Sequence, residues 1–390
     1  MIYFGALLAI LLVALCGERF AHARARRTIR HRIHVNGIRG KSSVARLIAA
    51  GLRGGGLKTW GKVTGTLPII IDDAGRDIPI SRMNGSSLSE QRTVFQLASR
   101  ARVDALVIEC MAIQPQYQRV AQDAFVQATV GVITNVRPDH LESYGDQFES
   151  VAHALAQTIP SNGVLLTTPG VALPLFEDVA HKHGSSVVCV DRSAIDERDL
   201  EGFAYVEHAD NIALALGVCS HLGVSREAAL ASMLTAIPDP GVLSSFTVRV
   251  DSKELHVINA LAANDPESTL QLFRRLVADK WRCPVYVLLN SRRDRPLRSI
   301  QLGRLVLRMP AAGYFVSGTD VHGVMSSAKE GGADQGLLVS CARMKPDTIA
   351  ERILADVPSE AVLFAIGNTG AGGLDTIAAL AAMGPIGEEE

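Results

Sequence analysis

The apolar and polar positions of this chain repeat in one order from residue 33 onward: a short β-branched run, a turn, then a helix-like stretch. The strand-like runs are 33–35, 105–110, 129–134, 164–167 and 187–190. The helix-like stretches are 42–52, 116–124, 148–158, 173–183, 210–222 and 225–236. Such alternation is typical of a parallel sheet covered by helices. We therefore expect an α/β domain over residues 30–240.

A second alternation follows a cluster of proline and glycine at 237–241, which we take as a domain boundary. The later strand-like runs are 255–258, 285–289, 314–316, 337–339 and 362–366. Helical stretches such as 266–278 and 371–382 lie between or after them. This pattern predicts a second, smaller, Rossmann-like domain over residues 241–390.

The amino-terminal segment 2–16 carries no charged side chain, and the stretch 18–32 after it is rich in arginine. Fifteen helical residues reach about 22 Å, so spanning a bilayer would also need Gly17, Phe20 and the flanking arginines. Because the basic residues follow the apolar run, we expect a membrane-anchor helix at 1–20 and cytoplasmic domains at the cell membrane. A cleaved signal peptide, suggested by AHA at 21–23, and an ordinary buried helix remain the alternatives.

Composition narrows the classes of function. The 390 residues include 39 basic and 40 acidic side chains, for a formal net charge of −1, so no global field favours nucleic acid as a partner. The six cysteines are scattered singly, without zinc spacing, which predicts reduced core thiols. An apolar share of 47% with 20% charged residues suits a buried parallel sheet.

The segment 37–43 (GIRGKSS) lies where a strand is expected to end and a helix to begin. Backbone N–H groups and the helix dipole bind phosphate at such a junction. Gly37 and Gly40 would let the backbone approach the phosphates, Lys41 would pair with their oxygens, and Ser42 would hold Mg²⁺. The first glycine of the longer Walker motif is absent, and a glycine turn beside an unrelated lysine is the alternative.

Two further residues follow predicted strands. Glu109 ends the apolar run 105–108, and a carboxylate there points into the crevice where α/β sheets bind ligands. His140 lies just past the run 129–134. A turn-capping or arginine-paired glutamate and a structural histidine are the alternatives. If these strands neighbour the one before the glycine loop, Lys41, Ser42, Glu109 and His140 surround one Mg-nucleotide.

The order of these motifs resembles Mur ligases and folylpolyglutamate synthases. The resemblance implies an ATP-binding central domain, a Rossmann-like carboxyl-terminal domain, and an acyl phosphate that an amine attacks. It implies Mg²⁺ at Ser42, Glu109 and His140, with Lys41, Glu109 and His140 serving catalysis. It implies ATP contacts from Gly37, Gly40, Lys41, Ser42, Ser43 and Asn135. The segments 257–268 and 290–296 resemble the family's second-domain motifs, and Arg293 and Asp294 are expected to complete the site.

The chain is most similar to a narrower branch, the poly-γ-glutamate synthase catalytic subunits of the CapB/PgsB type. The similarity rests on the apolar amino terminus and on the segments 36–43, 109–112 and 367–373. It implies a ligase that polymerises glutamate into capsular poly-γ-glutamate, with a small integral membrane subunit and an export subunit as partners. A folylpolyglutamate-type ligase on a soluble acceptor and a membrane-associated P-loop ATPase that forms no bond are the alternatives.

The chain departs from the Mur pattern in several places. The segment 155–157 (LAQ) replaces the carbamylated lysine, Asn259 replaces an aspartate, and the separate amino-terminal substrate domain is not seen, so uridine-diphosphate peptides are not expected.

An anionic polymer also calls for donors and cations near the cleft. The expected contacts are Lys62, Thr64, Thr66, Arg82 and Arg92. Solvated surface side chains are the alternative at each of these positions.

Overall fold

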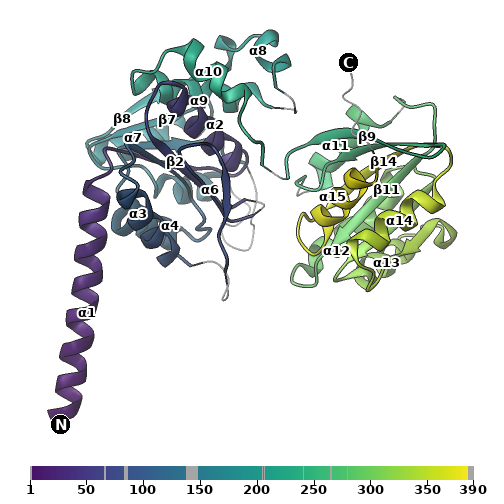
Figure 1. Ribbon diagram of the computed structural model, residues 1–390, viewed down its shortest axis with the longest axis horizontal. Helices are drawn as coiled ribbons and strands as arrows, with labels where there is room; N and C mark the ends of the chain where they lie inside the picture. The colour runs from purple at the N-terminus through teal and green to yellow at the C-terminus, as the bar shows by residue number, and fades with distance from the viewer. Residues whose placement is uncertain are drawn as a thin grey trace. The chain divides into compact units, whose positions relative to one another are not determined.

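The computed structural model describes residues 2–65, 67–82, 87–137, 148–203, 205, 207–239, 241–263, 266–278 and 280–384. The chain forms two compact units, Met1–Asp239 and Pro240–Glu390. Each unit is built on its own largely parallel sheet with helices on both faces (Figure 1). The expected α/β architecture is therefore confirmed.

The sheet of the first unit has the strand order β4-β3-β2-β5-β1-β6-β7-β8 in the described residues. Its strands are β1 (His31–Asn36), β2 (Thr59–Val63), β3 (Ile69–Ile71), β4 (Asp77–Pro79), β5 (Ala105–Glu109), β6 (Val130–Ile133), β7 (Val164–Thr167) and β8 (Ser186–Cys189). The strand β1 pairs in parallel with β5 on one side and β6 on the other. The carboxyl ends of β2, β5, β1 and β6 therefore meet at one edge, where open α/β sheets bind ligands.

Helices cover both faces of this sheet. They are α1 (Ile2–Arg27), α2 (Lys41–Gly54), α3 (Ser89–Arg100), α4 (Pro115–Val120), the π-helix η1 (Ala121–Val126), α6 (Phe148–Ala156), α7 (Leu173–Lys182), η2 (Arg192–Ala194), α8 (Glu197–Glu201), α9 (Ala209–His221) and α10 (Arg226–Leu234). Val44, Leu47 and Ile48 of α2 form an apolar stripe at helical spacing and are fully buried in the core shared with α9 and α10. A second core lies under α3 and η1, on the opposite face of β5.

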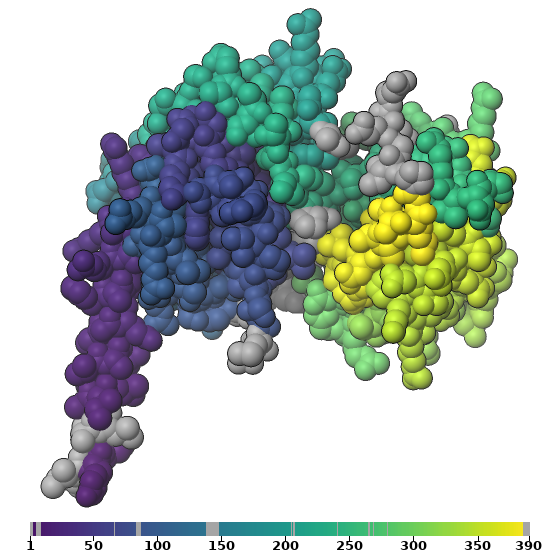
Figure 2. Space-filling model, in the orientation of Figure 1, coloured from purple at the N-terminus to yellow at the C-terminus, as the bar shows by residue number. Residues whose placement is uncertain are grey.

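The helix α1 contacts the first unit through its carboxyl-terminal part. His22 Nε2 lies 2.9 Å from the carbonyl oxygen of Phe125, and Arg26 Nη1 donates to the carbonyl oxygen of Ala124 at 3.0 Å. The amino-terminal part projects away from the rest of the first unit (Figure 2). It exposes large apolar side chains: Tyr3, Phe4, Ile10, Leu11, Leu12, Val13 and Leu15. Among the described helices, none combines the length and the apolar character that crossing a membrane requires. The expected anchor at 1–20 is therefore not confirmed.

The second unit has the strand order β13-β12-β11-β14-β10-β9, with β9 antiparallel at one edge. Its strands are β9 (Ser244–Val250), β10 (Lys253–Asn259), β11 (Val285–Ser291), β12 (Gly313–Gly318), β13 (Leu338–Ser340) and β14 (Glu360–Gly367). Its helices are α11 (Pro266–Leu276), α12 (Pro296–Leu305), η3 (Val306–Arg308), α13 (Val321–Glu330), η4 (Gln335–Leu337), α14 (Pro346–Asp356) and α15 (Gly373–Met383). Because β14 is central and both its faces are covered, its side chains from Ala361 to Ile366 are fully buried.

The cysteines are all free thiols, but they are not all in the core. Cys110, Cys219 and Cys341 are buried, whereas Cys16 and Cys189 are exposed. Cys16 lies on the free part of α1 and Cys189 ends the edge strand β8, so neither position is covered. The expectation of core thiols is therefore wrong for these two residues.

Candidate active site

The predicted phosphate loop connects β1 to α2 at the centre of the first sheet. Gly37 and Gly40 have φ angles of 132° and 78°, which side-chain-bearing residues rarely adopt. A Cβ atom on Gly37 would lie 2.0 Å from Thr134 Oγ1. Thr134, the residue after β6, therefore lies so close to the loop that only glycine fits at position 37.

Side chains at the ends of β1 and β6 hold the loop in place. The Gly37 amide donates to Asn36 Oδ1 at 2.8 Å. Asn135 forms two hydrogen bonds with the backbone of Arg39: Oδ1 accepts from N at 3.1 Å, and Nδ2 donates to O at 3.0 Å. Thr134 Oγ1 donates to the same Arg39 carbonyl at 2.6 Å. Asn135, predicted to contact the cofactor, thus fixes the shape of the loop.

The first turn of α2 is arranged to receive an anion. Gly40, the residue before the helix, makes no side-chain capping bond, and the first-turn N–H groups have no carbonyl partner within the helix. Lys41 Nζ donates to the carbonyl oxygens of Gly37 at 2.8 Å and Ile38 at 3.3 Å. Ser43 lies in the same turn and is partly exposed. These groups fit a nucleotide phosphate, because Lys41 can exchange neutral carbonyls for charged oxygens.

Glu109 meets the loop from the end of β5. Its side chain is 2% exposed, and Oε2 accepts hydrogen bonds from Ser42 Oγ at 2.9 Å and from the Thr64 amide at 2.6 Å. A Cβ atom on Gly65 would lie 2.2 Å from Ser42 Oγ, so this glycine leaves room for the hydroxyl. Thr64 N and Gly65 are site features that the sequence analysis did not assign.

The oxygens of Ser42 and Glu109 suit Mg²⁺, which takes one or two protein oxygens together with substrate phosphates and water. Within the described part of the chain, no group of three or more His, Cys, Asp or Glu side chains gathers at one point. The two oxygens fit a metal whose remaining ligands come from a nucleotide and water. His140, the third predicted ligand, lies outside the described residues.

A buried ion cluster lies beside this edge of the sheet. Lys62 is 0% exposed, and its Nζ lies 2.7 Å from Glu90 Oε1, while Arg82 Nε donates to Glu90 Oε2 at 2.6 Å. Burial lowers the pKa of Lys62. Burial opposes ionisation of Glu90, but the hydrogen bonds from Arg82 and Lys62 outweigh it and lower the pKa of that carboxyl.

Three of the cations predicted to contact the polymer are paired with acidic side chains of the first unit. The alternative of a solvated surface side chain is wrong for Lys62, because its amine is enclosed with Glu90. Arg82 is already engaged by the same carboxylate, and Arg92 pairs with Glu18 of α1. Thr64 enters the site through its backbone amide, and Thr66 lies outside the described residues.

The side chain of Asn211, on α9, packs against Gly40. A Cβ atom on Gly40 would lie 2.6 Å from Asn211 Oδ1. Asn211 Nδ2 donates to Glu207 Oε1 at 2.7 Å, and burial raises the pKa of Glu207. The contact between Asn211 and Gly40 was not predicted, because Asn211 lies in an ordinary helical stretch that is far from the loop in sequence.

The second unit gathers polar groups where β11 and β14 end. Asn290 Nδ2 donates to the carbonyl oxygens of Asn368 and Gly370, each at 2.6 Å. A Cβ atom on Gly367, whose φ is 110°, would lie 2.3 Å from the Asn290 carbonyl oxygen. Asn290 therefore shapes the glycine-rich loop 367–373. Asn259, at the end of the neighbouring β10, is also buried.

Arg293 and Asp294, predicted to complete the site, follow β11 directly. Asp294 is paired with Arg292 rather than with Arg293: Nε donates to Oδ1 at 2.9 Å and Nη2 to Oδ2 at 2.6 Å. The Arg292 hydrogen bonds lower the pKa of Asp294. The Arg293 amide donates to Thr319 Oγ1 at 3.0 Å. Both predicted residues thus lie at the carboxyl edge of their own sheet.

The uncapped start of α2, the amine of Lys41 and the Ser42–Glu109 pair meet at the carboxyl edge of the first sheet. This arrangement suits the nucleotide site of a Mur-type ligase. A family model for the Mur ligase middle domain matches residues 35–192, and one for the poly-gamma-glutamate synthase CapB C-terminal domain matches residues 245–383. The chain belongs to the CapB family of poly-γ-glutamate synthases, and it is an amide ligase of the ATP-dependent Mur superfamily.

Two curated relatives establish this membership. The chain is 33% identical over 365 residues to the PGA synthase CapB of Bacillus subtilis (strain 168), covering 92% of both proteins. It is 38% identical over 319 residues to the capsule biosynthesis protein CapB of Bacillus anthracis, covering 81% of this chain and 68% of that protein.

Solved structures show the same fold at low sequence identity. E. coli FolC in complex with ADP matches with a TM-score of 0.70 and 18% identity, covering 94% of this chain and 93% of that one. The Yersinia pestis bifunctional folylpolyglutamate synthase/dihydrofolate synthase, complexed with AMPPNP and Mn ion, gives 0.67 and 17%, covering 93% and 92%. MurF from Acinetobacter baumannii gives 0.64 and 13%, covering 93% and 79%.

Proposed function

We propose that this chain polymerises glutamate into poly-γ-glutamate, using ATP to activate the carboxylate that receives the next residue. The observation that carries the proposal is the meeting of Lys41, Ser42 and Glu109 at the carboxyl edge of the first sheet in a chain of the CapB family. A carboxylate oxygen would attack the γ-phosphorus of ATP and release ADP, giving an acyl phosphate. The amine of the next glutamate would attack the acyl carbon, releasing phosphate and one proton.

The residues of the loop would perform distinct tasks in this reaction. Lys41 would leave the carbonyls of Gly37 and Ile38 and follow the charge that develops on the transferred phosphoryl oxygens. Bound Mg²⁺ would supply Lewis-acid stabilisation of those oxygens. Ser42 and Glu109 would hold it, with His140 as a further predicted ligand. The rigid bracing by Asn135 and Asn211 would keep the amides of the first turn oriented before substrate arrives.

Arg293 and Asp294 remain predicted participants from the second unit. Glutamate and the growing chain are the proposed substrates, and a small integral membrane subunit and an export subunit the proposed partners.

We place the enzyme at the cytoplasmic face of the cell membrane because α1 exposes an apolar surface followed by arginines. Flotation of the full chain with anionic vesicles tests this placement. Loss of flotation in Phe4→Glu/Val13→Glu protein would support it, and failure of the unsubstituted chain to float would refute it.

The activity is tested with membranes containing the full chain, ATP, Mg²⁺ and labelled glutamate. Acid-insoluble polymer and ADP are followed together. We expect Lys41→Ala to lower both by at least about 100-fold. Lys58→Ala removes an exposed lysine that pairs with Asp73 on the surface, and it should leave both unchanged.

The same assay separates the alternatives. A labelled small product on a soluble acceptor would indicate a folylpolyglutamate-type ligase. Nucleotide hydrolysis without glutamate incorporation would refute ligation. Ser42→Ala should raise the Mg²⁺ concentration needed for half-maximal ADP release, whereas Ser43→Ala should not, because Ser42 alone of the two contacts Glu109.

A further inference from the structure

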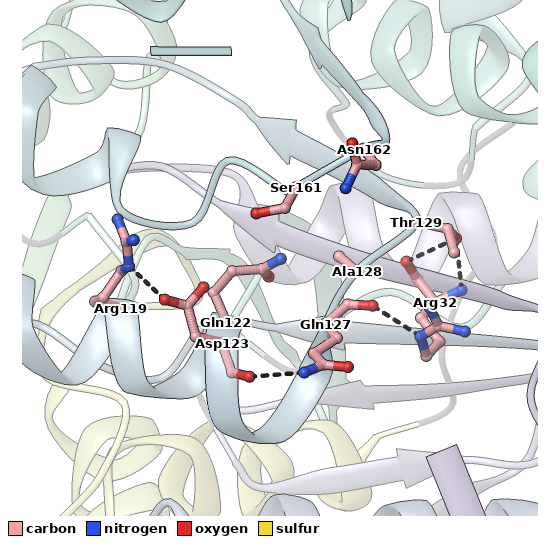
Figure 3. Close-up of a pocket in the computed structure, with 9 residues that line it drawn as sticks. All are labelled: Arg32, Arg119, Gln122, Asp123, Gln127, Ala128, Thr129, Ser161 and Asn162. Atoms are coloured by element: carbon pink, nitrogen blue, oxygen red, sulfur yellow. Dashed lines mark hydrogen bonds and ion pairs between the residues drawn. The ribbon is translucent and has the colours of Figure 1, made fainter. Parts of the chain in front are cut away.

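A polar cavity lies at the opposite, amino edge of the first sheet (Figure 3). Its volume is about 480 Å³, within the range of about 300–1,000 Å³ that small-molecule sites occupy. It is lined by Arg32, Arg119, Gln122, Asp123, Gln127, Ala128, Thr129, Ser161 and Asn162. Gly37 follows the end of β1 and lies five positions after Arg32, so the cavity is roughly 17 Å from the phosphate loop. It is therefore separate from the nucleotide site.

The principal charge in this cavity is Arg32. Its Nε donates to the carbonyl oxygen of Gln127 at 2.8 Å and its Nη1 to that of Ile29 at 2.9 Å. These bonds fix the guanidinium plane, and no bond of Nη2 is formed within the described part of the chain. Burial lowers the pKa of Arg32, and no carboxylate among the described residues offsets that cost. A half-buried cation held in this way favours an anion in the cavity.

The charges around Arg32 add to this preference. Arg119 lies on the rim and pairs with Asp123, which is the one acidic side chain among the described lining residues. Arg26 lies close enough for the positive charge of Arg32 to lower its pKa, after the larger effect of burial. The region therefore carries more positive than negative charge, and the compensating charge would come from a ligand.

The other lining groups restrict the kind of anion. The side-chain oxygen of Gln127, the amide of Asn162 and the hydroxyl of Ser161 offer both donors and acceptors. The Gln122 side-chain oxygen is bonded to His34, and the Gln127 side-chain nitrogen donates to the Asp123 carbonyl. Figure 3 shows Ser161 and Asn162 on one side of the cavity and Asp123 and Gln127 on the other. A phosphate dianion has no N–H group to donate, so it would leave the side-chain oxygens of Gln127 and Asn162 unused. A γ-linked glutamyl chain instead presents one carboxylate, one amide N–H and one carbonyl in each residue.

The geometry points to a second binding site, at the amino edge of the first sheet, for a carboxylate-bearing γ-glutamyl segment of the product, with Arg32 as the residue that receives its carboxylate. This assignment rests on the proposed function for the identity of the chain. A site away from the nucleotide would let the enzyme hold the polymer between successive additions. It thereby raises the local concentration of the end to be extended.

The π-helix η1 marks the same place independently. Five-residue turns of this kind are rare and occur frequently at functional sites. The π-turn ends at Gln127, whose amide donates to the Gln122 carbonyl at 2.7 Å and whose φ is 43°. This turn brings Gln122 to the cavity and aims the Gln127 carbonyl at Arg32.

The test measures binding to the full chain carrying Lys41→Ala, in which a bound segment is not extended. Tri-γ-glutamate labelled at its amino end is titrated by fluorescence anisotropy. We expect Arg32→Gln to weaken its affinity by about 10-fold or more. Arg30→Gln makes the same charge change at an exposed position two residues away, and it should leave the affinity unchanged.

Ser161→Phe supplies a second variant, because it fills the cavity from an exposed rim position and leaves the bonds of Arg32 intact. It should weaken binding as Arg32→Gln does. Equal affinity in the Arg32→Gln, Ser161→Phe and Arg30→Gln proteins would overturn the assignment. The assignment would also be overturned if inorganic phosphate or free glutamate displaced the labelled tri-γ-glutamate at the same concentration as unlabelled tri-γ-glutamate does.

This binding measurement involves no turnover. Absence of glutamate-dependent ADP release from the unsubstituted chain would therefore count against the proposed function. Unchanged binding in the two cavity variants would count against the second site.

Discussion

The stability of the first unit should fall in mild acid because of one buried histidine, His34 on β1. Its side chain is 0% exposed, and Nδ1 lies 2.9 Å from Gln122 Oε1. The other ring nitrogen, Nε2, is buried and has no hydrogen-bond partner in the described structure. Burial lowers the pKa of His34 from 6.5 to about 4, and the positive charge of Lys62 acts in the same direction.

The sign and size of the effect follow from linkage. Above pH 6.5 His34 is neutral in both the folded and the unfolded chain, so its contribution to stability is complete. Between pH 6.5 and about 4 the unfolded chain binds a proton that the folded chain does not, and the free energy of unfolding falls by about 1.4 kcal/mol per pH unit. The loss attributable to His34 is therefore about 2 kcal/mol at pH 5.

The two tryptophans of the chain allow the first unit to be observed alone. Trp60 lies on β2 of the first unit and Trp281 in the second unit, so Trp281→Phe leaves fluorescence from the first unit only. Urea unfolding of this protein at pH 7 and pH 5 gives the pH-dependent loss. We expect His34→Gln to reduce that loss by about 2 kcal/mol. His153→Gln, at an exposed position on α6, should not change it.

His34→Gln is itself expected to alter stability at pH 7, so the informative quantity is the difference between the two pH values in each protein. A pH-dependent loss of the same size with and without His34 would refute the reasoning. It would mean that the ring accepts a proton in the folded state without penalty.

Three further outcomes follow from the structure. Gly65→Ala should displace the hydroxyl of Ser42. Metal titrations should then show a several-fold rise in the Mg²⁺ concentration for half-maximal ADP release, with little change in the stability of the fold. Glu90→Gln should lower the free energy of unfolding by about 3–5 kcal/mol, because it leaves the buried charge of Lys62 without its carboxylate partner. In urea titrations, the double variant with Lys62→Met should recover most of that loss. Asn290→Ala should free the glycine-rich loop 367–373, and hydrogen exchange of its amides should accelerate while that of β12 does not.

The central strands of the first unit were predictable because buried parallel strands have continuous runs of apolar residues in their sequence. The run at 164–167 coincides with β7, and the runs at 33–35 and 105–110 differ from β1 and β5 by few residues. The condition that Glu109 and the phosphate loop lie on neighbouring strands is met, since β1 pairs with β5. The short strands β3 and β4 were missed because three-residue antiparallel pairs at a sheet edge leave little periodicity to detect.

Other features of the site depend on contacts between residues that are distant in sequence, and the local sequence pattern does not reveal such contacts. The strand β2 (Thr59–Val63) contains a lysine and a glycine and lacks the pattern of a buried strand. The hydrogen bond to Glu109 from the amide of Thr64, the residue after this strand, was therefore not predicted. Lys62 was taken for an exposed cation because its partner Glu90 comes from a helix far along the chain. A lysine is buried only where such a partner is available, and the pairing is a property of the fold.

The strand β1 shows most clearly why the polar interior was not predicted. Its sequence HRIHVN alternates polar and apolar residues, a pattern typical of a strand with one face in water. Here it is central, and its polar face is covered by α4 and η1. Asn36 Nδ2 donates to Gln118 Oε1 at 2.7 Å, and His34 bonds to Gln122 as described above.

The partners along this helix are spaced by four residues and then five, from 118 to 122 to 127. A regular α-helix repeats every 3.6 residues, so a step of five would turn the chain at 127 away from the strand, whereas an i→i+5 turn brings it back. The π-turn therefore matches the helix to the polar face of β1. Hydrogen bonds join this helical segment to β1 at Arg32, His34 and Asn36. Because Asn36 Oδ1 also accepts a hydrogen bond from the Gly37 amide, the last of these contacts holds the start of the phosphate loop as well.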